Sequence, residues 1–380
     1  MLELNLRLIK MIDNNTLPEA WQKQLEELGF NEFTAVQEES FEPLKDGMNV
    51  IATSPTGTGK TLAYLLPLLL NVKKGGGQQL LILAPNSELA GQIHDVTKTW
   101  AEPLGLKASL VIAGASLKRQ IERLKKAPEI VIATPGRALE LVKDKKIKMT
   151  AINTIVLDEV DQLVEDGQFN FVKPIINRTP KDYQFAFYSA TADSQLEKIQ
   201  QIAENKLSNL VEINVTETDS NVEHIFVEVE KRKKVDFLRQ LAHLPNMRGL
   251  VFFNKLDDLG NAEQKLQYQG IDAQSLASDI GGRFRKVLLD KFKNGEITLL
   301  LATDLLARGI DIENLDYVIN FDVPVTEESY LHRAGRTGRM GKDGTVLSII
   351  SSPIEKKNLK KLANDPQEKI LKAQQFVGKK

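Results

Sequence analysis

The chain of 380 residues contains no cysteine, which excludes a disulfide scaffold and a zinc site with cysteine ligands. It also has no apolar run of the roughly 20 residues that a membrane-spanning helix needs; the longest extends only from Leu62 to Val72. Residues 1–15 carry charges throughout and lack the apolar block and cleavage site of a signal peptide. These absences favour a cytoplasmic protein that does not enter a membrane.

The chain also lacks an excess of charge of either sign, with 50 basic and 51 acidic residues and a net charge of −1. An RNA would therefore have to bind a local site, through backbone N–H groups, helix N-termini and a few arginines or lysines. The composition, 42% hydrophobic and 27% charged, is that of a globular protein. The length fits two domains of about 150–200 residues each.

Short apolar runs rich in β-branched residues alternate with helical patterns along the chain. Such runs are buried on both faces, which is typical of parallel sheets covered by helices. They lie at 49–52, 80–83, 130–133, 154–157 and 184–188 in the first half, and at 250–253, 272–276, 298–302, 317–321 and 344–350 in the second. Two sets of five predict two doubly wound α/β domains with parallel sheets.

A short polar segment, 216–221 (TETDSN), separates the two sets and lacks apolar periodicity, so we interpret it as a linker. The predicted domains are then residues 1–215 and 222–362, followed by a basic tail of residues 363–380. Residues 355–380 hold eight lysines against three acids. We interpret them as a solvated helix and a frayed tail, with a tail that contacts RNA as the alternative.

A glycine-rich segment, SPTGTGKT, follows an apolar run and precedes an apolar helical pattern. This is the strand–loop–helix context of a phosphate-binding loop, in which backbone N–H groups surround the phosphates. Gly57 and Gly59 allow the backbone to curl, Lys60 reaches the β- and γ-phosphates, and the Thr61 hydroxyl ligates Mg²⁺. The predicted nucleotide-binding residues of this loop are Ser54, Pro55, Thr56, Gly57, Thr58, Gly59, Lys60 and Thr61.

Two acidic residues end the apolar run IVL at 155–157. Asp158 would hold Mg²⁺ and Glu159 would polarise the attacking water. The alternative, a solvent-facing acidic loop, is disfavoured because the pair follows a phosphate-binding loop.

Arginines recur at three-residue spacing, with glycines between them, in YLHRAGRTGR at 330–339. Arg336 and Arg339 could neutralise charge that develops on the γ-phosphate, a role worth about 10³–10⁵ in rate in related phosphoryl transfers. For Arg333 we prefer the simpler interpretation of a basic surface helix.

The ordered motifs SPTGTGKT, PNSELA, TPGR, DEVD, SAT, ATDLLARGID and HRAGRTGR together resemble those of the DEAD-box RNA helicases of superfamily two. The resemblance extends from about Gly29 to Ser351 and implies two tandem RecA-like domains that use ATP and Mg²⁺ to act on RNA. The compact chain is similar to small Bacillus-type members linked to ribosome assembly. Ribosomal precursor particles are therefore the expected partners, and a monomer is the expected state.

The resemblance also implies roles for individual residues. Gln37, which closes GFNEFTAVQ, would read the adenine edge because an amide can donate and accept, and Asp311 would contact the ribose. The residues that would couple hydrolysis to the RNA face are Asp161, Ser189, Thr191 and His332. The implied RNA ligands, which would grip phosphates and 2′-OH groups without reading sequence, are Pro85, Asn86, Ser87, Gly114, Thr134, Pro135, Gly136, Arg137, Arg285, Thr303 and Asp304.

The sequence departs from the family pattern at several of these positions. DEVD replaces DEAD, but Val160 leaves every charged atom in place, so we expect hydrolysis to survive. Ser87 stands where the family has arginine, Ala115 where it has glycine, and Gly282 where it has glutamine. These departures motivate an alternative to an ATP-driven helicase, namely an ATP-gated RNA clamp or assembly scaffold with little unwinding. A DNA translocase that shares the two-domain core is a third possibility, and the RNA-type motif set argues against it.

Overall fold

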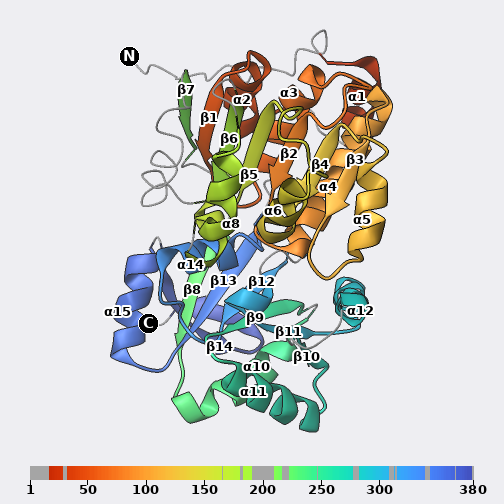
Figure 1. The fold of residues 1–380 in the computed structure, drawn as a ribbon. Helices are drawn as coiled ribbons and strands as arrows, with labels where there is room; N and C mark the ends of the chain where they lie inside the picture. Colours follow the sequence, from red (N-terminus) through yellow and green to blue (C-terminus); the bar gives the residue numbers. More distant parts are fainter. Residues whose placement is uncertain are drawn as a thin grey trace, which may run out of the picture. The chain divides into compact units, whose positions relative to one another are not determined.

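The computed structural model describes residues 17–28, 32–164, 166–179, 183–190, 209–215, 222–245, 247–276, 282–307, 312, 315–338, 343–363 and 365–378. The chain divides into two compact units, Met1–Thr216 and Glu217–Lys380 (Figure 1). The predicted linker, 216–221, lies outside the described residues, so its bounds stay a prediction. None of the helices in the described ranges has the length and apolarity that crossing a membrane requires.

The N-terminal unit is built on a seven-stranded parallel sheet in the order β3-β4-β2-β5-β6-β1-β7. Five strands coincide with the predicted apolar runs: β1 (Asn49–Thr53), β2 (Leu80–Leu83), β4 (Ile130–Ala133), β5 (Thr154–Asp158) and β6 (Gln184–Ser189). The edge strands β3 (Ala108–Val111) and β7 (Leu210–Asn214) are additional. Both edge strands are partly exposed, so they lack the continuous apolar pattern that predicts a central strand.

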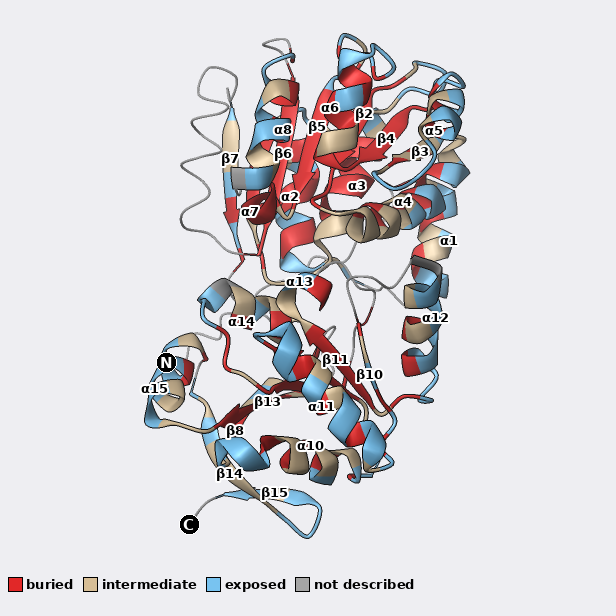
Figure 2. Ribbon diagram, turned by 60° about the horizontal axis from the view of Figure 1, so that its bottom comes forward, coloured by how far each residue is buried: buried red, intermediate tan, exposed pale blue. Residues whose placement is uncertain are grey.

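Helices cover both faces of this sheet because successive strand residues point to opposite faces. On one face of the sheet, strand residues such as Val50 and Ala52 pack in a core with the helices α1 (Glu19–Glu27), α2 (Ala35–Lys45), α3 (Lys60–Asn71) and α4 (Ser87–Ala101). On the other face, strand residues such as Ile51 pack in a second core with α5 (Leu117–Leu124), α6 (Pro135–Lys143), α7 (Val160–Leu163) and α8 (Asp166–Ile176). The central strands β2, β4, β5 and β6 are accordingly buried throughout (Figure 2).

The C-terminal unit holds an eight-stranded sheet in the order β10-β11-β9-β12-β13-β8-β14-β15. Its strands are β8 (Val222–Glu228), β9 (Gly249–Phe253), β10 (Ala273–Ser275), β11 (Leu299–Thr303), β12 (Tyr317–Asn320), β13 (Gly344–Ile350), β14 (Gln367–Lys372) and β15 (Gln375–Gly378). Its helices are α10 (Lys234–Ala242), α11 (Leu256–Tyr268), α12 (Gly282–Lys293), α13 (Asp304–Ala307), α14 (Glu327–Ala334) and α15 (Pro353–Leu362). Two parallel-dominated α/β sheets confirm the predicted fold class.

The predicted frayed tail is wrong. Residues 367–378 form a hairpin in which β14 lies parallel to β8 and β15 lies antiparallel to β14. Leu371 and Phe376 pack against the core beneath α10 and α11. The turn residues Ala373 and Gln374 both have positive φ, 46° and 62°, which suits a two-residue hairpin but is unusual without glycine or asparagine. The turn therefore carries no sequence signal.

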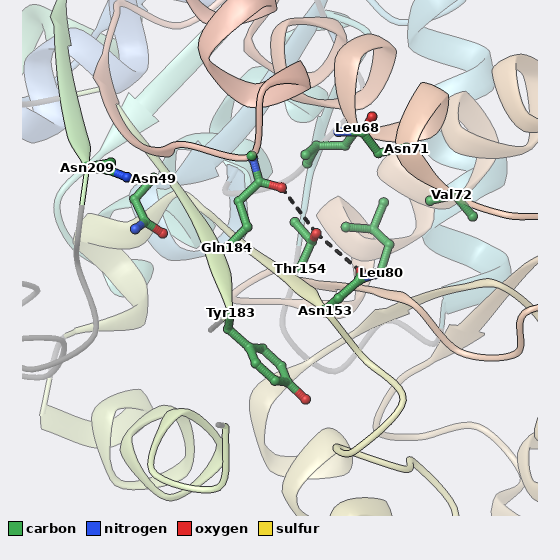
Figure 3. Close-up of a pocket in the computed structure, with 11 residues that line it drawn as sticks. Asn49, Leu68, Asn71, Val72, Leu80, Asn153, Thr154, Tyr183, Gln184 and Asn209 are labelled. Atoms are coloured by element: carbon green, nitrogen blue, oxygen red, sulfur yellow. Dashed lines mark hydrogen bonds between the residues drawn. The ribbon is translucent and has the colours of Figure 1, made fainter. Parts of the chain in front are cut away.

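A cavity of about 390 Å³ lies at the amino ends of β1, β2, β5 and β6 (Figure 3). Uncharged polar side chains line most of it, and the Thr154 hydroxyl donates a hydrogen bond to the Gln184 side chain at 3.2 Å. The predicted site residues lie at the opposite, carboxyl ends of the strands. The cavity and the candidate site are therefore different places.

Candidate active site and RNA interface

Predicted residues of the phosphate-binding loop, the acidic pair and the coupling set meet at the carboxyl ends of three neighbouring strands, β5, β6 and β1. Asp158 ends β5, Ser189 ends β6, and Ser54 follows β1. Ligands of open α/β sheets bind at this edge. The Ser54 N–H donates to the Ser189 carbonyl at 3.0 Å, so the loop after β1 is tied directly to the end of β6.

The loop between β1 and α3 has the backbone of a phosphate cradle. Gly57 and Gly59 have φ values of 84° and 85°, which residues other than glycine rarely adopt. A Cβ atom on Gly59 would also come within 2.3 Å of the Gln37 side chain. Helix α3 begins at Lys60, so its N-terminus faces the loop and favours an anion.

Side chains of the loop form hydrogen bonds within the loop itself. The Lys60 ammonium donates to the carbonyls of Ser54 and Pro55, at 2.7 and 2.9 Å. The fully buried Ser54 hydroxyl donates to the Thr58 hydroxyl at 2.7 Å, and Thr58 donates to the Pro55 carbonyl at 2.9 Å. Serine at position 54 thus adds a side-chain bond within the loop.

Gln37 lies against the same loop. Its amide oxygen accepts from the Thr34 N–H at 3.0 Å, and its amide nitrogen donates to the Gly59 carbonyl at 3.2 Å. The Thr34 hydroxyl donates to the Thr58 carbonyl at 2.7 Å. An amide nitrogen carries a second N–H, so the contact with adenine stays a prediction while Gln37 already supports the loop.

The acidic pair lies where β5 ends. Asp158 is only 3% exposed, so the alternative of a solvent-facing acidic loop is wrong for this residue. Its carboxylate accepts from the Tyr64 hydroxyl at 2.8 Å and from the Glu159 N–H at 3.0 Å. Burial, and next the charge of Glu159, raise the pKa of Asp158 to about 6.

Glu159 adopts a left-handed backbone conformation, with φ 52° and ψ 55°, and caps α7. Such conformations cost free energy for residues other than glycine and cluster at functional sites. The Glu159 carboxylate accepts a hydrogen bond from the Gln162 side chain. Asp161, two residues on, is fully buried, and one of its oxygens accepts from the Gln162 N–H at 3.1 Å.

The implied RNA ligands of the N-terminal unit occupy the other half of the same sheet edge, after β2, β3 and β4. Asn86 and Thr134 are the N-cap residues of α4 and α6. The Asn86 side chain accepts from the N–H groups of Glu88 and Leu89, at 3.1 and 2.9 Å. Two helix N-termini therefore start at this half of the edge, which suits phosphate binding through backbone N–H groups.

Arg137, in the first turn of α6, is held inside the unit. Its guanidinium forms an ion pair with Glu140 at 2.9 Å and donates to the Ala115 carbonyl at 3.4 Å. Gly114, next to Ala115, has a φ of 77° and open space around it. The loop after β3 is thus fastened to α6.

In the C-terminal unit, the predicted basic surface helix is wrong for Arg333, which is 1% exposed. Its guanidinium donates to both carboxylate oxygens of Asp304, at 2.6 and 2.8 Å. It also donates to the Asn320 side chain at 3.0 Å and the Asp322 carbonyl at 2.8 Å, and to the Asn254 side chain at 2.8 Å. All these partners follow or end β9, β11 and β12, so Arg333 ties α14 to the carboxyl edge of the sheet.

The other predicted residues of this unit lie near that edge. Thr303 ends β11, and Arg285, on α12, donates to the Leu306 carbonyl. His332 is half-buried on α14, and Arg336 follows that helix and is also half-buried, with its carbonyl accepting from the Leu315 N–H at 3.2 Å. Three predicted residues lie outside the described residues: Thr191, Asp311 and Arg339.

Comparison with known proteins assigns the chain to a family. A DEAD/DEAH box helicase model matches residues 34–199, and a helicase conserved C-terminal domain model matches residues 233–341. The DEAD-box ATP-dependent RNA helicase CshC of Bacillus cereus is 40% identical over 347 residues, which cover 90% of this chain and 87% of that protein. The chain belongs to the DEAD-box ATP-dependent RNA helicases. It is therefore an ATP-hydrolysing enzyme of that family.

Further members of the DEAD-box family are also similar. The "Probable ATP-dependent RNA helicase YfmL" of Bacillus subtilis is 43% identical over 337 residues, 88% of this chain and 89% of that one. Among solved structures, S. cerevisiae Dbp5 bound to RNA and ADP BeF3 matches with a TM-score of 0.81 and 25% identity, over 93% of each chain. The predicted pair of RecA-like domains is thereby confirmed.

The sequence of this DEAD-box chain did not lead us to predict a role for two residues that the structure places in the site. Tyr64 bonds Asp158 across 94 positions, and Asn254 bonds Arg333 across 79. A tyrosine amid leucines in the helix after the phosphate-binding loop was the available signal for the first. Asn254 directly follows a buried strand, as site residues of this fold often do.

Proposed function

We propose that the chain couples ATP hydrolysis to the local, poorly processive opening of RNA duplexes. The observation that carries the proposal is the single sheet edge of the N-terminal unit. One half of this edge holds the phosphate cradle and the acidic pair, and the other half holds two helix N-termini among the implied RNA ligands. ATP and RNA bound there would lie on one rigid element.

The chemistry follows from the donors at the first half. Lys60 and the loop N–H groups would bind the phosphates, and Glu159 would polarise the attacking water. Asp158 and Thr61 would hold Mg²⁺, which prefers oxygen ligands. The fit is supported by the burial of Asp158 and by its pKa near 6, because a carboxylate whose charge is poorly compensated gains from a cation. When bound, the metal would neutralise charge on the phosphates.

Closure of the two units would complete the site. We propose that Arg336 and Arg339 then reach the γ-phosphate, that Gln37 reads adenine, and that Asp311 contacts the ribose. The residues that would carry the change to the RNA face are Asp161, Ser189, Thr191 and His332. ATP would favour the closed state, in which one RNA strand is bent away from A-form geometry, and hydrolysis would reset the units.

An ATP-gated RNA clamp with little unwinding is the second candidate. It is favoured by Ser87 and Ala115, which replace the family's arginine and glycine, and by the occupied side chains of Asn86 and Arg137. With fewer side chains free to contact an RNA strand, the enzyme would bind RNA but would deform it little. In either case, a cytoplasmic monomer that acts on ribosomal precursor particles is the proposed setting.

A strand-displacement assay run beside an ATPase assay tests the proposal. We expect the wild-type chain to separate short RNA duplexes while it hydrolyses ATP, and Lys60→Ala and Glu159→Gln each to abolish turnover, because they remove the phosphate contact and the water-polarising carboxylate. Turnover without displacement would favour the clamp. Turnover near the wild-type rate in either variant would refute the residue assignments.

A further inference from the structure

Tyr64 is a fully buried residue of α3 whose hydroxyl points at the acidic pair. The hydroxyl donates to one oxygen of Asp158 at 2.8 Å, while the Glu159 N–H donates to the other at 3.0 Å. The carboxylate is therefore held at both oxygens, and rotation about its terminal bond would break one of the two hydrogen bonds. A phenol that donates to a carboxylate forms a charge-assisted bond, which is stronger than one between neutral groups.

Tyr64 is also related to the second proposed metal ligand. Thr61 lies three residues earlier on the same helix, and residues at this spacing are neighbours on one helix face. The Tyr64 hydroxyl donates to the Asp158 carboxylate at 2.8 Å. The phenol is thus a hydrogen-bond donor placed beside both proposed ligands of the metal.

We propose that Tyr64 is a positioning residue for the Mg²⁺ site. Its hydroxyl fixes the orientation of the Asp158 carboxylate, so that less freedom is lost when a cation binds. Partners that orient metal ligands in this way typically contribute about 10–100-fold in metal affinity. The inference rests on the proposed function, because it takes Asp158 as a ligand of Mg²⁺.

The structure supplies a matched control in Tyr188. This residue of β6 is also fully buried, and its ring centroid lies 5.1 Å from that of Tyr64. Its hydroxyl is buried and, unlike that of Tyr64, forms no hydrogen bond with Asp158. Tyr64→Phe and Tyr188→Phe therefore remove the same atom from adjacent buried rings, and only the first removes a bond to Asp158.

The test is the binding of fluorescent ADP to the full chain, titrated with Mg²⁺ and repeated without metal. For Tyr64→Phe we expect the Mg²⁺ concentration at half-saturation to rise about 10–100-fold, with ADP binding in the absence of metal unchanged. Tyr188→Phe should stay within about twofold of wild type. Tyr64→Phe should also have no further effect in an Asp158→Asn background, because the bonded carboxylate is gone.

Two results would overturn the inference. One is an unchanged Mg²⁺ titration for Tyr64→Phe. The other is an equal loss of ADP binding with and without Mg²⁺, which would mean that the hydroxyl only stabilises the fold. If the wild-type chain itself binds ADP with no dependence on Mg²⁺, the proposed metal site fails as well, and this outcome is distinguishable from the other two.

Discussion

The guanidinium of Arg333 sits where the carboxyl ends of β9, β11 and β12 meet. It fills the five hydrogen-bonding directions described above and lies 5.0 Å from the ring centroid of Phe252. A buried arginine is tolerated only when its donors are satisfied in this way. The Asp304 carboxylate, predicted to contact RNA, is thereby neutralised from inside the unit. Its side chain stays 33% exposed, so a contact with RNA is still a prediction.

Arg333→Gln should destabilise the C-terminal unit by about 3 kcal/mol, because it removes the buried guanidinium that pairs with Asp304 and satisfies its other hydrogen-bond partners. The free energy of unfolding in urea measures the effect. Asp304→Asn added to Arg333→Gln should recover part of the loss, since the unpaired charge is then removed. A double variant that is less stable than Arg333→Gln would contradict this account of the pair.

At the scale of elements, the C-terminal hairpin shows a segment whose sequence gave no sign of its fold. β14 contains two lysines and β15 contains none, and lysines of this region form ion pairs. Lys356 pairs with Glu228 and Glu368, at 2.9 and 2.8 Å, and Lys369 pairs with Glu223. The lysine excess of residues 355–380 is therefore partly an ion-pair network with acids of β8 and β14 rather than a free basic surface.

Removal of residues 367–380 should lower the free energy of unfolding by about 2 kcal/mol, because Leu371 and Phe376 then no longer cover the core beneath α10 and α11. Urea unfolding of the truncated and full chains measures the difference. Val377→Ala, at a side chain that is 37% exposed, is the control and should change stability little. An unfolding midpoint identical to that of the full chain would mean that the hairpin does not belong to the folded unit.

At the scale of the whole molecule, the features that could be predicted from the sequence are those that depend on residues close together in the chain. The strands at the ten apolar runs and the positions of Asp158 and Ser54 at strand ends follow from apolar runs bounded by polar residues. The burial of Arg333 and the bond from Tyr64 to Asp158 depend on partners 11–94 positions away. No spacing rule specifies such partners, and that is why these two contacts were missed.

The central claim is that one sheet edge links ATP hydrolysis to RNA. The rate of ATP hydrolysis by the full chain, measured alone, with single-stranded RNA and with DNA of the same sequence, tests it most directly, with Lys60→Ala as the blank. The account predicts a rate that rises with RNA, rises less with DNA, and vanishes in the variant. A wild-type rate that is the same in all three conditions would contradict it.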